Sequence, residues 1–308
     1  DSTWALQGSS DIRADSVTVR FSGTSTLLFS DGETQWMVDG WFSRPGPLRL
    51  ALGRIAPDIQ AISAGLAANE VTELDAVIPI HSHYDHAMDA PEVARRTGAT
   101  VIGSEATANI ARGWQLPEEQ IRVVADGERV GLGAFTLTFL ESRHIPYPDP
   151  ELVERLITDS EIPEPLVPPA TIYDYKLGKA WALHIAHPAG TAMVVGSAGF
   201  VPGLLDSYDV DQLFLGIGAL GAKSDDYRED YWQHTVDATS PEQVILIHWD
   251  SLTSPIDRPL VGEVRAASLF APGGGALLDF LQEKVATNPQ LRLATLPRFE
   301  PVLLMPGR

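Results

Sequence analysis

Residues 81–86 read His-Ser-His-Tyr-Asp-His and constrain the chain more than any other segment, because they gather three imidazoles and one carboxylate. The segment is too short and too polar to be a core element. It directly follows residues 74–80, an apolar run that predicts a buried strand. The histidines are therefore expected where a strand ends in a loop, with side chains aimed at one or two shared points.

This combination of side chains predicts a metal centre. Zinc and similar metals take histidine nitrogen at roughly 2.0 to 2.1 Å and carboxylate oxygen near 2.0 to 2.2 Å, and a catalytic site leaves one position open for water. Four candidate ligands within six residues exceed what one such site needs. A lone histidine is usually an ordinary polar residue, so the prediction depends on the clustering.

The predicted elements alternate between strands and helices and indicate an α/β fold. Asp89 and Glu92 form a predicted capping box for a helix that ends at Gly98. Two β-rich halves with helices outside suggest a four-layer sandwich, and the absence of repeats and long linkers predicts one domain over residues 1–308. The expected strands are 16–21, 26–30, 35–38, 74–80, 100–103, 135–139, 181–186, 192–195, 212–215, 243–247, 291–296 and 302–304. Two further helices are expected to begin at Pro57-Asp58 and at Ser104, and two more to span 230–238 and 276–285.

Residues 145–175 are irregular, because seven prolines interrupt them and only residues 151–157 read as a helix. A proline-rich segment of this length beside a histidine suggests a lid or a pocket wall. Aromatic side chains near the predicted centre are further candidates for the wall of a substrate pocket, with packing in the core as the alternative. These aromatic residues are Tyr84, Trp41, Tyr147 and Tyr173.

The charge of the chain argues against two classes of partner. Twenty-two basic and 41 acidic residues give a formal charge of −19, which repels nucleic-acid phosphates and anionic membrane surfaces. No apolar window approaches the ~20 residues that span a bilayer, so a soluble protein is expected. A start at Asp1 favours a periplasmic or secreted location over a cytoplasmic one, although a trimmed chain gives the same start. The sequence leaves the oligomeric state open.

The H-x-H-x-D-H motif resembles the signature of the metallo-β-lactamase superfamily, and the sequence is similar to that family over nearly its whole length. The turn Gly23-Thr24-Ser25 and an Asp39 that ends a strand also resemble its N-terminal pattern. The resemblance implies a four-layer αββα sandwich. It also implies two groups of metal ligands, which are His81, His83 and His144 for one metal and Asp85, His86 and His248 for the second.

The sequence departs from the family at Ser197, where many related hydrolases have an aspartate that bridges both metals. A neutral hydroxyl is a poor bridge, so the second metal binds more weakly or the site holds one metal. One subclass of metallo-β-lactamases also has a serine and holds its second zinc by Asp, His and His. Asp250 is a candidate partner for the imidazole of His248. One or two Zn²⁺ ions are expected, and iron, manganese or nickel suit the same ligands.

These residues predict a metal-dependent hydrolase that acts on a lactone, ester or amide (β-lactam) bond of a small molecule. A metal lowers the pKa of bound water to about 7, and the resemblance implies that Asp85 orients the hydroxide and relays a proton. The alternatives are a phosphodiesterase, a metal-binding protein with impaired catalysis, and an iron oxidoreductase, for which the chain has no room for a flavin domain. His184, His187 and His234 compete as ligands, with packing as the alternative.

Overall fold

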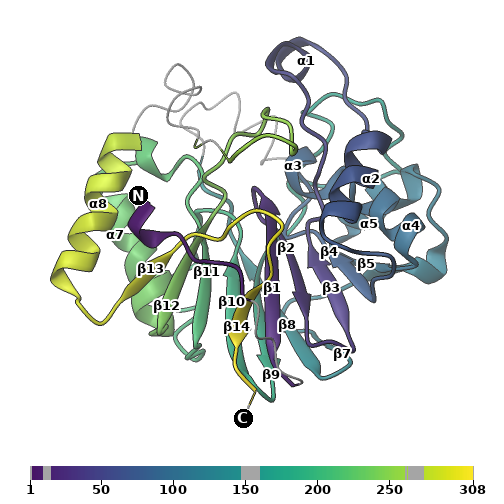
Figure 1. Ribbon diagram of the computed structural model, residues 1–308. Coiled ribbons are helices and arrows are strands. Elements are labelled where there is room, and N and C mark those ends of the chain that lie inside the picture. The colour runs from purple at the N-terminus through teal and green to yellow at the C-terminus, as the bar shows by residue number, and fades with distance from the viewer. Residues whose placement is uncertain (1, 10–14, 147–159, 261, 263–273, 308) are drawn as a thin grey trace.

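Two seven-stranded sheets form the centre of the molecule (Figure 1). The structure is a computed structural model that describes residues 2–9, 15–146, 160–260, 262 and 274–307. In sheet order, the first sheet contains β14 (Val302–Met305), β1 (Val17–Gly23), β2 (Thr26–Ser30), β3 (Gln35–Val38), β4 (Ala76–Ile78), β5 (Thr100–Gly103) and β6 (Ile121–Val123). The second contains β13 (Arg292–Ala294), β12 (Gln243–Ile247), β11 (Gln212–Gly216), β10 (Gly190–Val195), β9 (Ala180–His187), β8 (Phe135–Ser142) and β7 (Arg129–Leu132).

Both sheets combine an antiparallel and a parallel part. In the first sheet β14, β1, β2 and β3 pair antiparallel, and β3 to β6 pair parallel. In the second sheet β7 to β10 pair antiparallel, and β10 to β13 pair parallel. Strands β3, β4, β10 and β12 are each followed by a parallel neighbour and lead into crossover connections that can carry functional side chains, whereas β8 pairs antiparallel with both of its neighbours.

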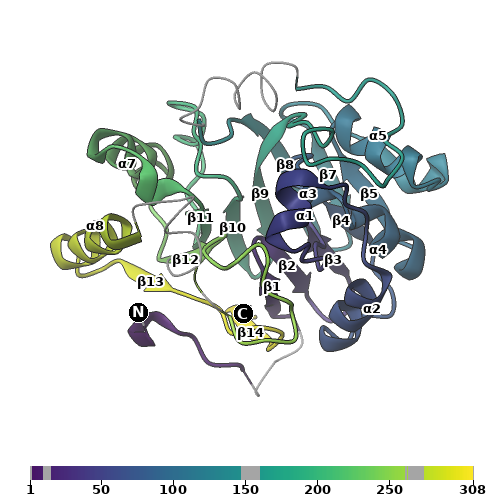
Figure 2. The same cartoon turned by 90° about the horizontal axis from the view of Figure 1, so that it is seen from above.

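Helices cover the outer face of each sheet (Figures 1 and 2). On one side lie α2 (Ile59–Ala68), α4 (Ala90–Thr97) and α5 (Glu105–Gly113), and on the other lie α7 (Asp225–Trp232), a π-helical turn at Gln233–Asp237 and α8 (Gly274–Thr287). Two short helices, α1 (Pro47–Leu52) and α3 (Tyr84–Ala87), lie at the end of the sandwich that is uppermost in Figure 1. This arrangement confirms the predicted α/β sandwich of four layers.

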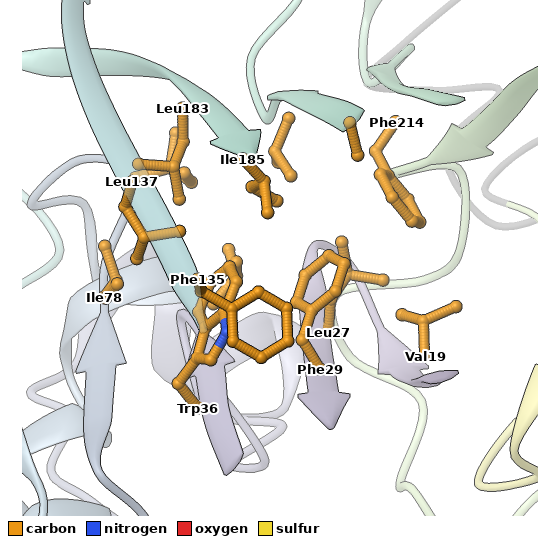
Figure 3. Close-up of a cluster of buried hydrophobic side chains, with 14 of the residues drawn as sticks. Val19, Leu27, Phe29, Trp36, Ile78, Phe135, Leu137, Leu183, Ile185 and Phe214 are labelled. Carbon is orange, nitrogen blue, oxygen red and sulfur yellow. The ribbon is translucent and has the colours of Figure 1, made fainter. Parts of the chain in front are cut away.

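The strands bury both faces, and the alternation of side chains assigns each residue to a layer. In β12, Ile245 points into the core between the sheets while Val244 packs against the helices of the second sheet. Figure 3 shows the central cluster, in which Phe29 stacks on Trp36 with ring centroids 4.5 Å apart and meets Phe214 of the opposite sheet edge-on at 5.4 Å. Offset and edge-to-face contacts of this kind stabilise aromatic cores.

Most predicted elements lie where the sequence placed them, and the helix boundaries show two differences. Asp58 caps α2 as expected, because its carboxylate accepts hydrogen bonds from the N–H groups of Gln60 and Ala61. The capping box predicted for α4 is wrong, because the Asp89 side chain makes no cap hydrogen bond. Helix α7 begins at Asp225, five positions before the predicted start of 230, since Ser224 caps it.

Two predictions fall outside the described residues. They are the helix at 151–157 and the position of Tyr147. Among the described residues, no helix is both long enough and apolar enough to cross a bilayer.

Candidate metal centre

The six predicted ligands follow three strands of the two sheets and meet at one edge of the sandwich. His81 and His83 follow β4, and Asp85 and His86 lie in α3, the short helix that continues this loop. His144 follows β8 and His248 follows β12, both in the other sheet. Strands β8 and β12 run in the same direction, so their carboxyl ends lie at the same edge. The fold thus brings together residues that are far apart in the sequence.

The ligand atoms form two triads, and within each triad they lie within 4.8 Å of one another. The first triad, as we call it, consists of His81, His83 and His144, and the second triad consists of Asp85, His86 and His248. His81 Nε2 and His83 Nδ1 are 3.1 Å apart. In the second triad, Asp85 Oδ2 lies 3.5 Å from His86 Nε2 and 3.3 Å from His248 Nε2.

These separations fit a bound metal. Two ligands at about 2.0 to 2.1 Å from a tetrahedral metal ion lie roughly 3.3 Å from each other. The three measured separations of 3.1, 3.3 and 3.5 Å agree with that value. Five imidazoles and one carboxylate are donors suited to zinc and to iron, manganese or nickel. The donor set and its spacing therefore fit the expected metals.

Hydrogen bonds orient two of the imidazoles. His86 Nδ1 donates to Asp39 Oδ2 at 2.8 Å, which turns Nε2 toward Asp85. His144 Nδ1 donates to its neighbour's carbonyl, Ile145 O, also at 2.8 Å. Partners of this kind fix the tautomer of a metal-binding histidine and keep its other nitrogen available as a ligand. This role of Asp39 was not predicted from the sequence, because only the parallel pairing of β3 with β4 places Asp39 beside His86.

The electrostatics keep three of the ligands, His81, His144 and Asp85, in the protonation states that bind metals. Burial, followed by repulsion from neighbouring histidines, holds the pKa values of His81 and His144 well below the usual range. Burial alone would raise the pKa of Asp85, but His86 and His248 hold it far below its usual value. Neutral imidazoles and a carboxylate are the metal-binding forms, so protons compete weakly at neutral pH.

Ser197 and Asp250 lie close to the triads but make contacts other than those expected. Ser197 Oγ accepts a hydrogen bond from Ile145 N at 3.1 Å and so restrains the residue after His144. Asp250 was a candidate partner for the His248 imidazole, with an ordinary loop carboxylate as the alternative. Its carboxylate instead accepts from Thr24 N at 2.6 Å and lies 3.5 Å from Arg298 Nη2.

A cavity of about 290 Å³ opens onto the triads. Its wall is mainly apolar, with Ile145 and Ile172 from the segment that was predicted to be a lid or wall. None of the described residues that line it is a lysine or an arginine. The lining residues are His81, His83, Tyr84, Asp85, His144, Ile145, Ile172, Gly196, Ser197, Ala198, Gly218, Ala219, His248 and Leu252.

The predicted aromatic wall is only partly present. Tyr84 lines the cavity, and its ring meets Trp41 edge-on with centroids 5.9 Å apart. The expectation for Trp41 is wrong, because this side chain is fully buried and the Arg44 guanidinium lies 3.9 Å from its ring centroid. Tyr173 is half-buried and is not among the lining residues, whereas the adjacent Ile172 is.

The three other histidines lie outside both triads and pack against other groups. His184 packs against Tyr208, His187 pairs with Asp31 at 3.3 Å, and His234 stacks on Phe200. Their contacts therefore agree with the alternative given for these histidines, which was packing and not metal binding.

Comparisons with known proteins agree with this architecture. A family model described as the beta-lactamase superfamily domain matches residues 52–158, which include H-x-H-x-D-H. The chain is similar in fold to Igni18, a metallo hydrolase from the archaeon Ignicoccus hospitalis, with a TM-score of 0.51, 15% identity and coverage of 95% of this chain and 97% of that chain. It is similar to an isothiocyanate hydrolase from Delia radicum gut bacteria, with a TM-score of 0.54, 14% identity and coverage of 94% and 99%.

A third structure of similar fold is CmlA, a diiron β-hydroxylase from Streptomyces venezuelae, with a TM-score of 0.50 and 14% identity. That likeness covers 95% of this chain and 55% of CmlA. No curated protein matches the sequence significantly.

Proposed function

We propose that the chain is a member of the metallo-β-lactamase superfamily and a metal-dependent hydrolase of small molecules, supported by its fold and by the family match that includes H-x-H-x-D-H. The observation that carries this proposal is the convergence of six side chains into two triads. A metal bound there would lower the pKa of water to about 7 and polarise a carbonyl oxygen. His81, His83 and His144 would hold one ion, and Asp85, His86 and His248 a second.

Asp85 has a further role in the proposed reaction. Its low pKa keeps the side chain a carboxylate at neutral pH, so it accepts a hydrogen bond from the attacking water and orients it. In the hydrolysis of an acyl bond, the proton of that water passes to the leaving group, and Asp85 lines the cavity where this transfer would occur.

The cavity supports a neutral substrate with an acyl bond, namely a lactone, an ester or a β-lactam amide. Its volume of about 290 Å³ suits a small molecule. Ile145, Ile172 and Leu252 provide apolar contact for such a substrate. A phosphodiester is less well matched, because an anionic phosphate is usually held by arginine or lysine and no described lining residue is basic.

The identity of the metal belongs to the proposal. Zinc is our first choice, and the similarity in fold to a diiron β-hydroxylase makes iron the second. Elemental analysis of the purified protein, before and after chelation, distinguishes these ions and gives the number bound per chain.

Replacement of a ligand tests the proposal directly. We expect His83→Ala to lose most bound metal and at least 100-fold of its hydrolytic activity, because the first triad loses one of its three ligands. The matched control is His184→Ala, which removes an imidazole that packs against Tyr208 outside the triads. Metal content is measured by elemental analysis, and activity on lactone, ester, β-lactam and phosphodiester substrates. A His83→Ala protein with full metal content and activity would refute the assignment.

A further inference from the structure

The turn between β1 and β2, residues Gly23, Thr24 and Ser25, contacts two members of the second triad. The backbone N–H of His248 donates to Thr24 O at 2.5 Å. Ser25 Oγ donates to Asp39 Oδ2 at 2.6 Å and lies 3.1 Å from His86 Nδ1. One short turn therefore supports an imidazole that follows β12 and an imidazole of α3, which belong to different halves of the chain.

Asp250 anchors this turn through a hydrogen bond to its backbone. The buried carboxylate accepts from Thr24 N at 2.6 Å, and Arg298 Nη2 lies 3.5 Å away. A Cβ atom added at Gly23 would lie 2.7 Å from Asp250 Oδ2 and 2.8 Å from Arg44 Nη2, so the glycine packs directly against this charged group. Buried, charge-assisted hydrogen bonds are stronger than neutral ones and hold their partners rigidly.

The backbone conformations show that these positions are closely constrained. Thr24 has φ 55° and His248 has φ 57°, which is the left-handed region that side chains other than glycine seldom adopt. Such conformations persist only where the surroundings impose them. The hydrogen bond between Thr24 and His248 joins the two strained residues directly.

We propose that the turn of residues 23–25, anchored by Asp250, positions His248 and His86 and thereby sets the metal affinity of the second triad separately from that of the first. This inference rests on the proposed metal-binding function. The turn residues and Asp250 are positioning residues, because they act through the imidazoles and not on the substrate. Ser197 restrains the backbone next to His144 of the first triad, and the turn restrains the backbone of His248 in the second triad in a similar way.

Gly23→Ala tests the inference, with Gly32→Ala as the matched control. Both glycines have positive φ, 117° and 93°, but a Cβ at Gly32 meets nothing within 4 Å. Metal-free protein is titrated with Co²⁺ and followed by its visible absorption. We expect Gly23→Ala to weaken the second equivalent at least tenfold and the first less than twofold, and Gly32→Ala to change neither by more than twofold.

Ser25→Ala provides a second, milder test, with Ser22→Ala as its control. Both hydroxyls are fully buried, but Ser22 accepts a hydrogen bond from Asn69, whereas Ser25 lies beside His86. We expect only Ser25→Ala to weaken the second equivalent, by about threefold to tenfold. Equal losses in both serine variants, or equal losses of both metal equivalents, would overturn the inference.

Hydrogen exchange of the His248 amide gives a readout that needs no metal. In metal-free protein we expect this amide to exchange at least tenfold faster in Gly23→Ala than in wild type, and at the wild-type rate in Gly32→Ala. If wild type binds no Co²⁺, the proposed function fails, while this exchange pattern still supports the positioning role. Unchanged exchange in Gly23→Ala would overturn the positioning role even in a protein that binds two metals.

Discussion

The side chain at position 197 is a neutral serine, whereas many related hydrolases have a negatively charged aspartate there. Ser197 Oγ accepts a hydrogen bond from Ile145 N and lines the cavity, but it brings no charge to either triad. We expect Ser197→Asp to tighten the second metal equivalent about tenfold, which is roughly 1.4 kcal/mol, because it adds an anionic ligand. Ser197→Asn has the same size without the charge. Calorimetric titrations that give the two variants equal metal affinity would contradict this prediction.

Asp89 is a buried carboxylate whose ionisation affects stability. Burial raises its pKa to about 6, although the N–H groups of Ser43 and Phe42 donate to it. The folded state thus holds a proton that the unfolded state releases above about pH 4, so this residue makes folding less favourable as pH rises from about 4 to 6.

We expect Asp89→Asn to remove this pH dependence. Relative to the variant, the free energy of unfolding of wild type should fall by up to about 3 kcal/mol between pH 4 and pH 7, following the shift of about two pKa units. Urea unfolding of both proteins across this range measures the difference. A difference that rises with pH, or does not change, would show that Asp89 is charged in the folded protein throughout.

The local part of the candidate site could be predicted from the sequence, and the supporting contacts could not. Residues 81–86 are contiguous, and His144 and His248 each follow a recognisable strand. Asp39 lies 47 positions from its partner His86, so only the pairing of strands reveals their contact. The prediction that Trp41 lines the pocket failed for the same reason, because its burial behind Tyr84 depends on tertiary packing.

At the scale of helices, similar aspartates have different roles. Asp58 caps α2 by accepting from Gln60 N and Ala61 N. Asp89 stands at the equivalent position of α4, but its carboxylate bonds to Ser43 and Phe42 of a distant loop. The sequence identifies both aspartates as helix caps, because it shows the local preference for aspartate at that position. It does not show the distant N–H and O–H groups that compete for the Asp89 carboxylate.

We expect Asp58→Ala to destabilise the protein by about 1 kcal/mol, the usual cost of losing a cap. Gln60→Ala is the control, because it keeps the backbone N–H that Asp58 binds. Urea unfolding gives both values. Equal stability of Asp58→Ala and wild type would show that water replaces the cap without cost.

At the scale of the whole molecule, each triad combines ligands from both sheets. His81 and His83 follow β4 of the first sheet, while His144 and His248 follow β8 and β12 of the second. A bound metal would therefore link the two layers across the top of the core. The four layers were predictable, because two β-rich halves alternate with helical segments, but the order of strands within each sheet was not, since it depends on tertiary pairing. The start of α7 was also not predictable, since its cap Ser224 precedes a polar first turn.

We expect chelation to lower the melting temperature. A metal present at 1,000 times its Kd stabilises the folded state by roughly 4 kcal/mol, and its removal reverses this gain. Calorimetry with and without chelator measures the shift, and added Zn²⁺ should restore it. His83→Ala should show a smaller shift. Equal shifts in wild type and His83→Ala would mean that the chelator acts elsewhere.

The pairing of β1 with β14 affects the order in which the protein forms during synthesis. Val19 lies opposite Val302, so β1 lacks one neighbour until nearly all of the described chain has left the ribosome. Until then β1 presents an unpaired strand edge, which is a template for association with other nascent chains. Completion of the first sheet therefore waits for the synthesis of β14, and chaperones that shield strand edges should raise the yield of folded protein.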